Sequence, residues 1–137
     1  MIRAVICFGL WSLVNLAQAE TWLHVAGTST HSRSGYNEQN LGLGLEWQAE
    51  PRWSAAIGFY RNSEYRTTAY ALGKYQWWKK DQLAINLNVG AATGYSMAPL
   101  VPVVLPEVCW HWTCFMIMPA FTASGTSAAA AYLRIPF

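Results

Sequence analysis

The sequence predicts an all-β fold, namely an eight-stranded antiparallel transmembrane β-barrel of the bacterial outer membrane. Two observations lead to this class. Apolar side chains recur at every second residue over several stretches, which is typical of strands with two unlike faces. The composition is also unusual, because 53% of the 137 residues are hydrophobic and only 12% are charged. No stretch beyond residue 19 has the roughly 18 uninterrupted apolar residues that a spanning helix needs, so strands account better for the apolar content.

Residues 1–19 fit a cleaved secretory signal peptide, which leaves residues 20–137 as a single barrel domain. Arg3 precedes an apolar run from Ala4 to Leu16, and Ala17-Gln18-Ala19 fits a signal peptidase site. The formal net charge of +2 offers no basic surface for nucleic acid. We therefore expect an exported protein without a nucleic-acid partner.

Three stretches, 41–48, 53–60 and 83–90, place bulky apolar side chains on one face and small or polar ones on the other. In a soluble sandwich the bulky face would point into a core, whereas in an outer-membrane barrel it faces lipid. Eight tryptophans and few charges favour the barrel, because little else would solvate an outer surface. The aromatic residues expected at the membrane interface are Trp47, Trp53, Tyr75, Trp77 and Trp78.

Eight strands are expected from this pattern. They are Thr21–Thr30, Leu41–Gln48, Trp53–Arg61, Thr67–Trp78, Leu83–Thr93, Leu100–Val108, Phe115–Phe121 and Ala128–Phe137. The last strand ends on Phe137 and resembles the terminal signature by which bacterial outer-membrane barrels are recognised for assembly. An even number of strands places both chain ends on the periplasmic side. The connections at 49–52, 79–82 and 109–114 then face the periplasm, and those at 31–40, 62–66, 94–99 and 122–126 face outward.

The segment from Cys109 to Cys114 is interpreted as a tight hairpin closed by a disulfide. If His111 and Trp112 form a two-residue turn, the two cysteines lie opposite each other at a non-hydrogen-bonded pair, whose close Cα atoms suit a cross-strand bridge. Cysteines of exported proteins pair by default. A zinc site of Cys109, His111 and Cys114 is the alternative, but it lacks a fourth ligand, so we expect no metal.

Residues 99–106 and 115–121 are apolar on both faces, so the lumen beside them is expected to be apolar too. Pro102, Pro106 and Pro119 cannot donate to a ladder, and neighbouring strands are expected to part there. An eight-stranded barrel has room for one slender ligand. An apolar lumen with a lateral opening would suit an acyl chain that enters from the bilayer. The alternative is a closed barrel with a packed interior and prolines at its rim.

Short segments occur in the order seen in PagP-type lipid A palmitoyltransferases. They are Tyr36-Asn37-Glu38, Gly42-Leu43-Gly44-Leu45, Phe59-Tyr60-Arg61-Asn62-Ser63, Ala92-Thr93-Gly94, Pro99–Pro106, Met118-Pro119 and Tyr132–Phe137. Together they span nearly all of residues 20–137, and the sequence resembles that family. The resemblance implies an outer-membrane acyltransferase that moves a palmitoyl chain from a phospholipid donor to lipid A. We expect it to act as a monomer and without a cofactor.

The resemblance also assigns catalytic residues. The family's catalytic histidine lies just before the Tyr-Asn-Glu segment, which makes His31 the candidate and His24 the weaker one. The family's serine matches Ser63, while the aspartate before that serine is replaced by Asn62. His31 would take the proton of the acceptor hydroxyl. Ser63 would act as a nucleophile or as a hydrogen-bond donor, and the sequence does not choose between these roles.

Asn62 is unusual in this set, because an amide brings no charge to stabilise an imidazolium. Three interpretations remain open. Glu38 or Glu64 supplies the charge, or the mechanism depends on it less, or the activity has been lost. Asn62 is retained as a positioning member of the catalytic set.

Substrate contacts are expected on either side of this set. Pro106 and Pro119 match the family's prolines that flank an opening between the sixth and seventh strands. Tyr60, Arg61 and Arg66 are assigned to substrate binding, the arginines because a guanidinium fits lipid phosphates. The same arginines could equally be ordinary charges of the outer rim.

The sequence also departs from the family. The family's amphipathic N-terminal helix is missing, the first outer loop is shorter, and Asn40 stands where a proline of a second opening would be. Two other functions therefore stay open. One is a lipid A deacylase-type hydrolase, which would use water as the acceptor. The other is a non-enzymatic structural or adhesion barrel.

Overall fold

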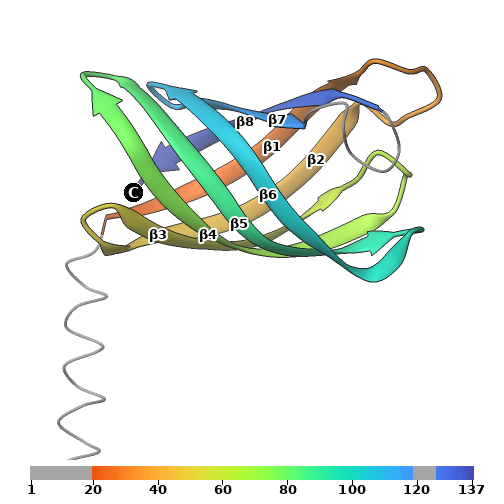
Figure 1. The fold of residues 1–137 in the computed structure, drawn as a ribbon, viewed down its shortest axis with the longest axis horizontal. Coiled ribbons are helices and arrows are strands. Elements are labelled where there is room, and N and C mark those ends of the chain that lie inside the picture. The colour runs from red at the N-terminus through yellow and green to blue at the C-terminus, as the bar shows by residue number, and fades with distance from the viewer. Residues whose placement is uncertain (1–19, 119–125) are drawn as a thin grey trace, which may run out of the picture.

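The computed structural model describes residues 20–118 and 126–137, which form a closed barrel of eight antiparallel strands (Figure 1). The strands are β1 (Thr21–His31), β2 (Gln39–Glu50), β3 (Trp53–Arg61), β4 (Thr67–Lys80), β5 (Leu83–Tyr95), β6 (Ala98–Trp110), β7 (Thr113–Met118) and β8 (Ala128–Pro136). The predicted eight-stranded antiparallel barrel is confirmed. The signal peptide expected at residues 1–19 lies outside the described residues. Within the described ranges, no helix is long and apolar enough to cross a membrane.

Each strand pairs with its neighbour in the chain, and β1 pairs with β8 to close the wall. The first and last described residues lie at the same end of the barrel (Figure 1). This end also carries the tight turns β2–β3, β4–β5 and β6–β7, and we call it the turn end. The opposite end carries the segments 32–38, 62–66 and 96–97, and we call it the loop end. Several strands continue beyond the predicted bounds: β2 begins at Gln39, β4 ends at Lys80 and β5 ends at Tyr95.

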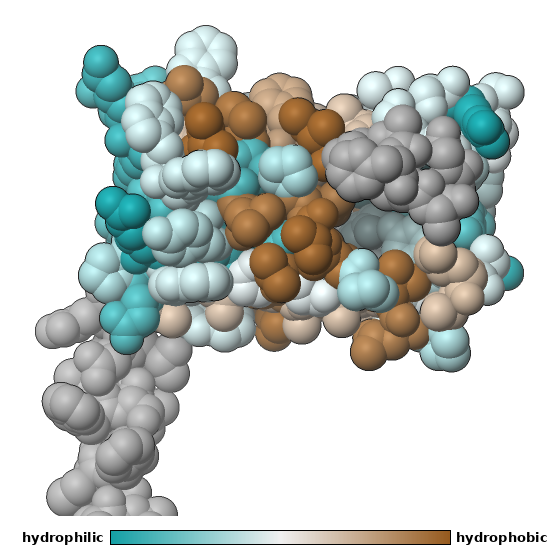
Figure 2. Space-filling view, viewed as in Figure 1, coloured by the Kyte–Doolittle hydropathy of each residue, from teal (hydrophilic) through white to brown (hydrophobic). Residues whose placement is uncertain are grey.

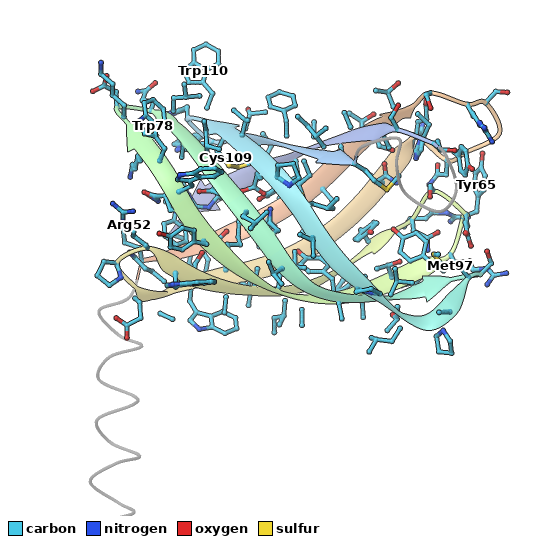
Figure 3. The ribbon with its side chains drawn as sticks, in the orientation of Figure 1. Arg52, Tyr65, Trp78, Met97, Cys109 and Trp110 are labelled. Carbon is cyan, nitrogen blue, oxygen red and sulfur yellow. A yellow bond between two sulfur atoms is a disulfide. The ribbon has the colours of Figure 1, made fainter. Side chains whose placement is uncertain are left out.

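The outer face of the wall is apolar. Side chains of alternate residues point outward and are exposed, including Leu41 (71%), Ile57 (50%) and Phe59 (55%). Hydrophobic side chains gather over the middle of the wall, and hydrophilic ones lie at the turn end (Figure 2). The prediction that the bulky face points outward is confirmed. Trp78 and Trp110 lie at the turn end, whereas Tyr65 and Met97 lie at the loop end (Figure 3).

A β-bulge in β1 decides which residues face the lumen near the loop end. The registers of β1 with β2 and with β8 both shift between Ala26 and Thr28. Gly27 is the extra residue relative to β8, whereas on the other side Asn40 and Leu41 of β2 lie opposite Gly27 alone. One extra residue reverses the alternation of inward and outward side chains. His24 and Ala26 line the lumen before the bulge, and Ser29 and His31 line it after the bulge.

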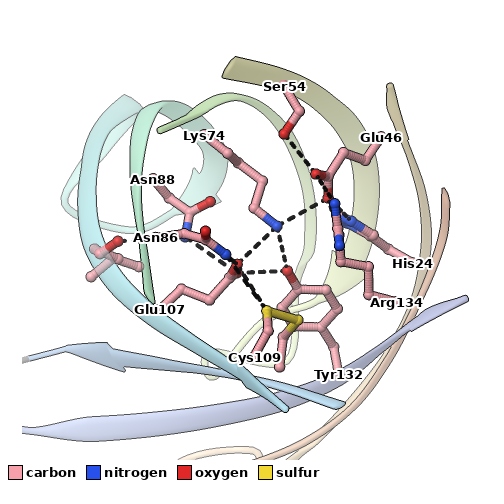
Figure 4. The surroundings of a disulfide bond; sticks show 12 residues. His24, Glu46, Ser54, Lys74, Asn86, Asn88, Glu107, Cys109, Tyr132 and Arg134 are labelled. Carbon is pink, nitrogen blue, oxygen red and sulfur yellow. Dashed lines mark hydrogen bonds and ion pairs between the residues drawn. A yellow bond between two sulfur atoms is a disulfide. The ribbon is translucent and has the colours of Figure 1, made fainter. Parts of the chain in front are cut away.

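A buried polar cluster lies across the lumen of the barrel (Figure 4). We define it as His24, Glu46, Lys74, Glu107, Tyr132 and Arg134. Lys74 lies at its centre and donates to Glu46 Oε2 (3.0 Å) and to Tyr132 Oη (2.8 Å). The two carboxylates of the cluster balance its lysine and arginine, so these four charges sum to zero. Buried charges are tolerated when they are paired in this way.

The disulfide between Cys109 and Cys114 is present, as predicted. The two residues are directly opposite in the β6–β7 register, and Trp110 pairs with Thr113 around the two-residue turn. His111 has a positive φ of 55°, which fits a turn residue. Because both sulfur atoms are used in the disulfide, they are not available as thiolate ligands for the alternative zinc site.

Candidate functional site

The half of the lumen nearer the loop end holds an apolar cavity of about 180 Å³. Small inward side chains create the space, since β8 contributes Ala128, Ala130 and Ala131 to its wall. Val103 of β6 and Met116 and Met118 of β7 add apolar surface. The expectation of an apolar lumen beside the sixth and seventh strands is therefore met in this half. The expectation covered residues 99–106 and 115–121; directly beyond the first stretch, Glu107 of β6 belongs to the buried polar cluster, so the apolar lining ends there.

His31 and Ser63 both line this cavity, although they come from different parts of the chain. His31 is the last residue of β1, and Ser63 follows β3. The backbone N–H of Asn37 donates to the carbonyl of Ser63 (2.8 Å), which ties the loop after β1 to the turn after β3. The imidazole of His31 stacks on the ring of Tyr36, with 4.7 Å between the ring centroids. The structure thus brings together the two residues that the sequence assigned as base and serine.

Of the two carboxylates that the sequence left open, Glu38 is the one near His31. Its Oε1 accepts the backbone N–H of His31 (3.3 Å) and lies 3.9 Å from His31 Nδ1. Glu64 is engaged elsewhere, because it accepts hydrogen bonds from the N–H and the hydroxyl of Ser96. Glu38 is half-exposed, so its charge acts on the imidazole partly through solvent.

The side chain of Asn62 is buried and links the β3–β4 turn to β4 and β5 by hydrogen bonds. Its Oδ1 accepts the backbone N–H groups of Glu64 (2.9 Å) and Arg66 (3.0 Å). Its Nδ2 donates to Thr68 Oγ1 (3.0 Å) and to the carbonyl of Gly94 (2.9 Å). All of these contacts are with β4, β5 and the turn itself. The structure gives Asn62 the contacts of a residue that fixes the turn carrying Ser63, and none of them is with His31.

The predicted substrate-binding residues divide into two groups. Tyr60 lines the cavity, and its hydroxyl is hydrogen-bonded to that of Tyr95 (2.6 Å). Arg61 and Arg66 lie at the loop end and are exposed. The guanidinium of Arg61 lies 6.0 Å from the centroid of the Tyr65 ring. No ion pair involving either arginine occurs within the described ranges.

The wall parts between β6 and β7 beside the cavity. Their register covers four pairs and ends at Glu107 opposite Met116, although β7 continues to Met118 and pairs with β8 as far as that residue. Pro106 is the residue directly beyond the last β6–β7 pair, whereas the β5–β6 register runs without interruption past it. The parting predicted from the prolines is therefore found on the β7 side of Pro106, whereas β6 stays paired with β5 at both Pro102 and Pro106. The same face is hollowed near the residues drawn in grey (Figure 2). Pro119 lies outside the described residues.

The floor of the cavity is polar. His24 and Tyr132 of the buried polar cluster line it, together with Tyr70. His24 Nε2 lies 2.7 Å from Glu46 Oε2, and its Nδ1 lies 3.3 Å from the hydroxyl of Tyr70. His24, the weaker catalytic candidate, is therefore held between a carboxylate and a phenol. A second, polar cavity of about 360 Å³ opens on the other side of the cluster, toward the turn end, and shares no lining residue with the first.

No protein-family model and no curated protein matches the chain.

Several polar residues of the cavity were missed by sequence reasoning, among them Ser29, Asn40 and Tyr95. Asn40 has the same inward parity as Gly42, Gly44 and Glu46, so the alternation extended by one more step would have found it. Ser29 could not be found in this way, because its direction depends on the bulge at Gly27. Tyr95 lies in the extension of β5 beyond its predicted end.

Proposed function

We propose that the chain is an outer-membrane β-barrel enzyme of the PagP type, which transfers a long acyl chain from a phospholipid to lipid A. The observation that carries the proposal is that His31 and Ser63 line one apolar cavity, beside a part of the wall where β6 and β7 are not paired. A base, a hydroxyl, an apolar chamber and a lateral parting are the parts that acyl transfer from a membrane lipid requires.

The proposed membrane location rests on the outer face of the barrel. Large apolar side chains are exposed at successive outward positions of β2, β3 and β5, and a water-soluble monomer rarely exposes so much contiguous apolar surface. Lipid would cover this surface, with the exposed tryptophans of the turn end at the interface. Membrane fractionation of cells that express the full chain tests this part directly. Recovery of the folded barrel in the soluble fraction would contradict it.

In the proposed reaction, the oxygen of the acceptor hydroxyl attacks the ester carbonyl of the phospholipid, and His31 takes the proton of that hydroxyl. The tetrahedral intermediate then collapses, the bond to the glycerol oxygen breaks, and that oxygen receives the proton. The products are acylated lipid A and a lysophospholipid. The Ser63 hydroxyl holds the oxyanion or forms an acyl-enzyme. Burial of the chain in the cavity stabilises the complex by about 0.8 kcal/mol per methylene.

The test is the mass spectrum of lipid A from cells with and without the protein. We expect a gain of one acyl chain, which His31→Ala and Ser63→Ala abolish. His111→Ala and Ser34→Ala are matched controls, because both residues are exposed and lie outside the cavity, and they should retain the gain. Loss of an acyl chain would instead identify a deacylase. A spectrum that the parent protein leaves unchanged would favour a non-enzymatic barrel.

A further inference from the structure

Three polar atoms that line the apolar cavity have no hydrogen-bond partner within the described residues. They are Ser29 Oγ, His31 Nδ1 and Asn40 Oδ1, and each is buried. All three residues line the same cavity. Buried polar atoms are nearly always paired, because an unpaired one has lost its water without compensation. Three such atoms around one space therefore indicate a ligand group that would pair with them.

The position of each atom is fixed by the wall. Asn40 is only 8% exposed, and its Nδ2 donates to the carbonyl of Arg61 (2.9 Å), so the amide oxygen is the free end. Ser29 is turned inward by the bulge at Gly27. The imidazole of His31 is held by stacking on Tyr36. The three atoms make no hydrogen bond, and the nearest charged group to His31 Nδ1 is Glu38 Oε1 at 3.9 Å.

The chemistry of the three atoms restricts the group that they would bind. Asn40 Oδ1 only accepts, whereas the Ser29 hydroxyl both donates and accepts. A carboxylate has no proton to give to Asn40. An ammonium cannot accept from Ser29, and its charge would be desolvated in an apolar cavity. A hydroxyl or an amide both donates and accepts without a charge.

We propose that Ser29, Asn40 and His31 form a subsite for the uncharged hydroxyl or amide group of an amphipathic ligand, whose apolar part fills the rest of the cavity. The subsite is argued from the cavity alone. Only its assignment to the acyl acceptor rests on the proposed function: there, Asn40 and Ser29 orient the acceptor hydroxyl, and His31 Nδ1 takes its proton. Asn40 and Ser29 are then positioning residues.

The test uses the full mature chain in phospholipid nanodiscs, with octanol and octanoate as probes and the side-chain amide signal of Asn40 in NMR as the readout. Octanol is expected to shift this signal, and octanoate is not. In Asn40→Leu and Ser29→Ala the affinity for octanol, followed through the backbone amides of β1 and β8, is expected to fall about tenfold, as one lost hydrogen bond predicts. Ser34→Ala, which changes an exposed residue outside the cavity, should retain the parent affinity.

Equal response to octanol and octanoate would overturn the subsite, as would unchanged octanol affinity in a folded Asn40→Leu variant. If Asn40→Leu does not fold, the octanol affinity of Ser29→Ala decides instead, and an unchanged affinity in that variant would overturn the subsite. Binding is measured without turnover, so the two proposals fail separately. Selective octanol binding with an unchanged lipid A spectrum would retain the subsite and remove the acyltransferase. Acylation of lipid A without octanol selectivity would retain the acyltransferase and remove the subsite.

Discussion

The Nζ of Lys74 lies 2.9 Å from Oε1 of Glu107, and both side chains are shielded from solvent inside the barrel. Lys74 also contacts Glu46 and Tyr132, so a single cation joins residues from β2, β6 and β8. Its removal would leave carboxylate charge buried without compensation.

Lys74→Met should therefore destabilise the barrel by about 3–5 kcal/mol, the usual cost of breaking a buried ion pair on one side. Urea unfolding in phospholipid vesicles, followed by tryptophan fluorescence, measures this change. Lys80→Met is the matched control, because Lys80 is exposed, and it should alter stability by less than about 0.5 kcal/mol. Equal stability of the two variants would contradict the prediction, because the contacts of Lys74 would then contribute little to the free energy of unfolding.

The disulfide should matter more for stability than its short loop suggests, because the described β6–β7 register has only four pairs and the bridge is one of them. The double variant Cys109→Ala/Cys114→Ala is expected to lose about 2 kcal/mol, the chain-entropy value for so short a loop, or more. The same unfolding assay is run with and without reductant. Reductant should lower the stability of the parent chain and leave the double variant unaffected; a parent that is insensitive to reductant contradicts the prediction.

Asn62→Asp tests whether residue 62 belongs to the catalytic set, as the sequence led us to expect, or fixes the β3–β4 turn, as its contacts support. An aspartate can still accept the N–H groups of Glu64 and Arg66, but it cannot donate to the carbonyl of Gly94. We expect a loss of about 1–3 kcal/mol in stability and no increase in acyl transfer, measured by urea unfolding and by lipid A mass spectrometry. A faster reaction in the aspartate variant would instead place residue 62 in the catalytic set.

Gly44→Ala tests the floor of the cavity. A Cβ at Gly44 would collide with the hydroxyl of Tyr70 and lie 2.9 Å from the carbonyl oxygen of Ile57. We expect overpacking to cost about 1–3 kcal/mol. Gly73→Ala is the control, because the nearest atom to its Cβ is 3.7 Å away. A Gly44→Ala variant as stable as this control would mean that Tyr70 moves aside freely.

Much of the fold was predictable because it depends on local alternation. Leucines and isoleucines at every second residue of β2, β3 and β5 identify the outward face whatever the rest of the chain does, and Cys109 opposes Cys114 once the two-residue turn is assumed. The prolines predicted the parting of the wall because a missing N–H is a property of the residue itself.

The interior was less predictable, since it depends on residues that meet only when the barrel closes. Glu46, Lys74 and Glu107 lie on three different strands, and no local pattern shows that they share one hydrogen-bonded cluster. The direction of His31 depends on the bulge at Gly27, which strict alternation does not reveal. The role of Asn62 was predicted from an aligned aspartate, whereas its contacts follow from the turn in which it lies.

The buried polar cluster divides the lumen, so the barrel has no continuous channel from one end to the other. Its two cavities open toward opposite ends and share no wall residue, so a molecule seated among the alanines of β8 has no passage beneath it toward the turn end. Such a molecule can reach or leave its seat only from the loop end or through the stretch where β6 and β7 are not paired.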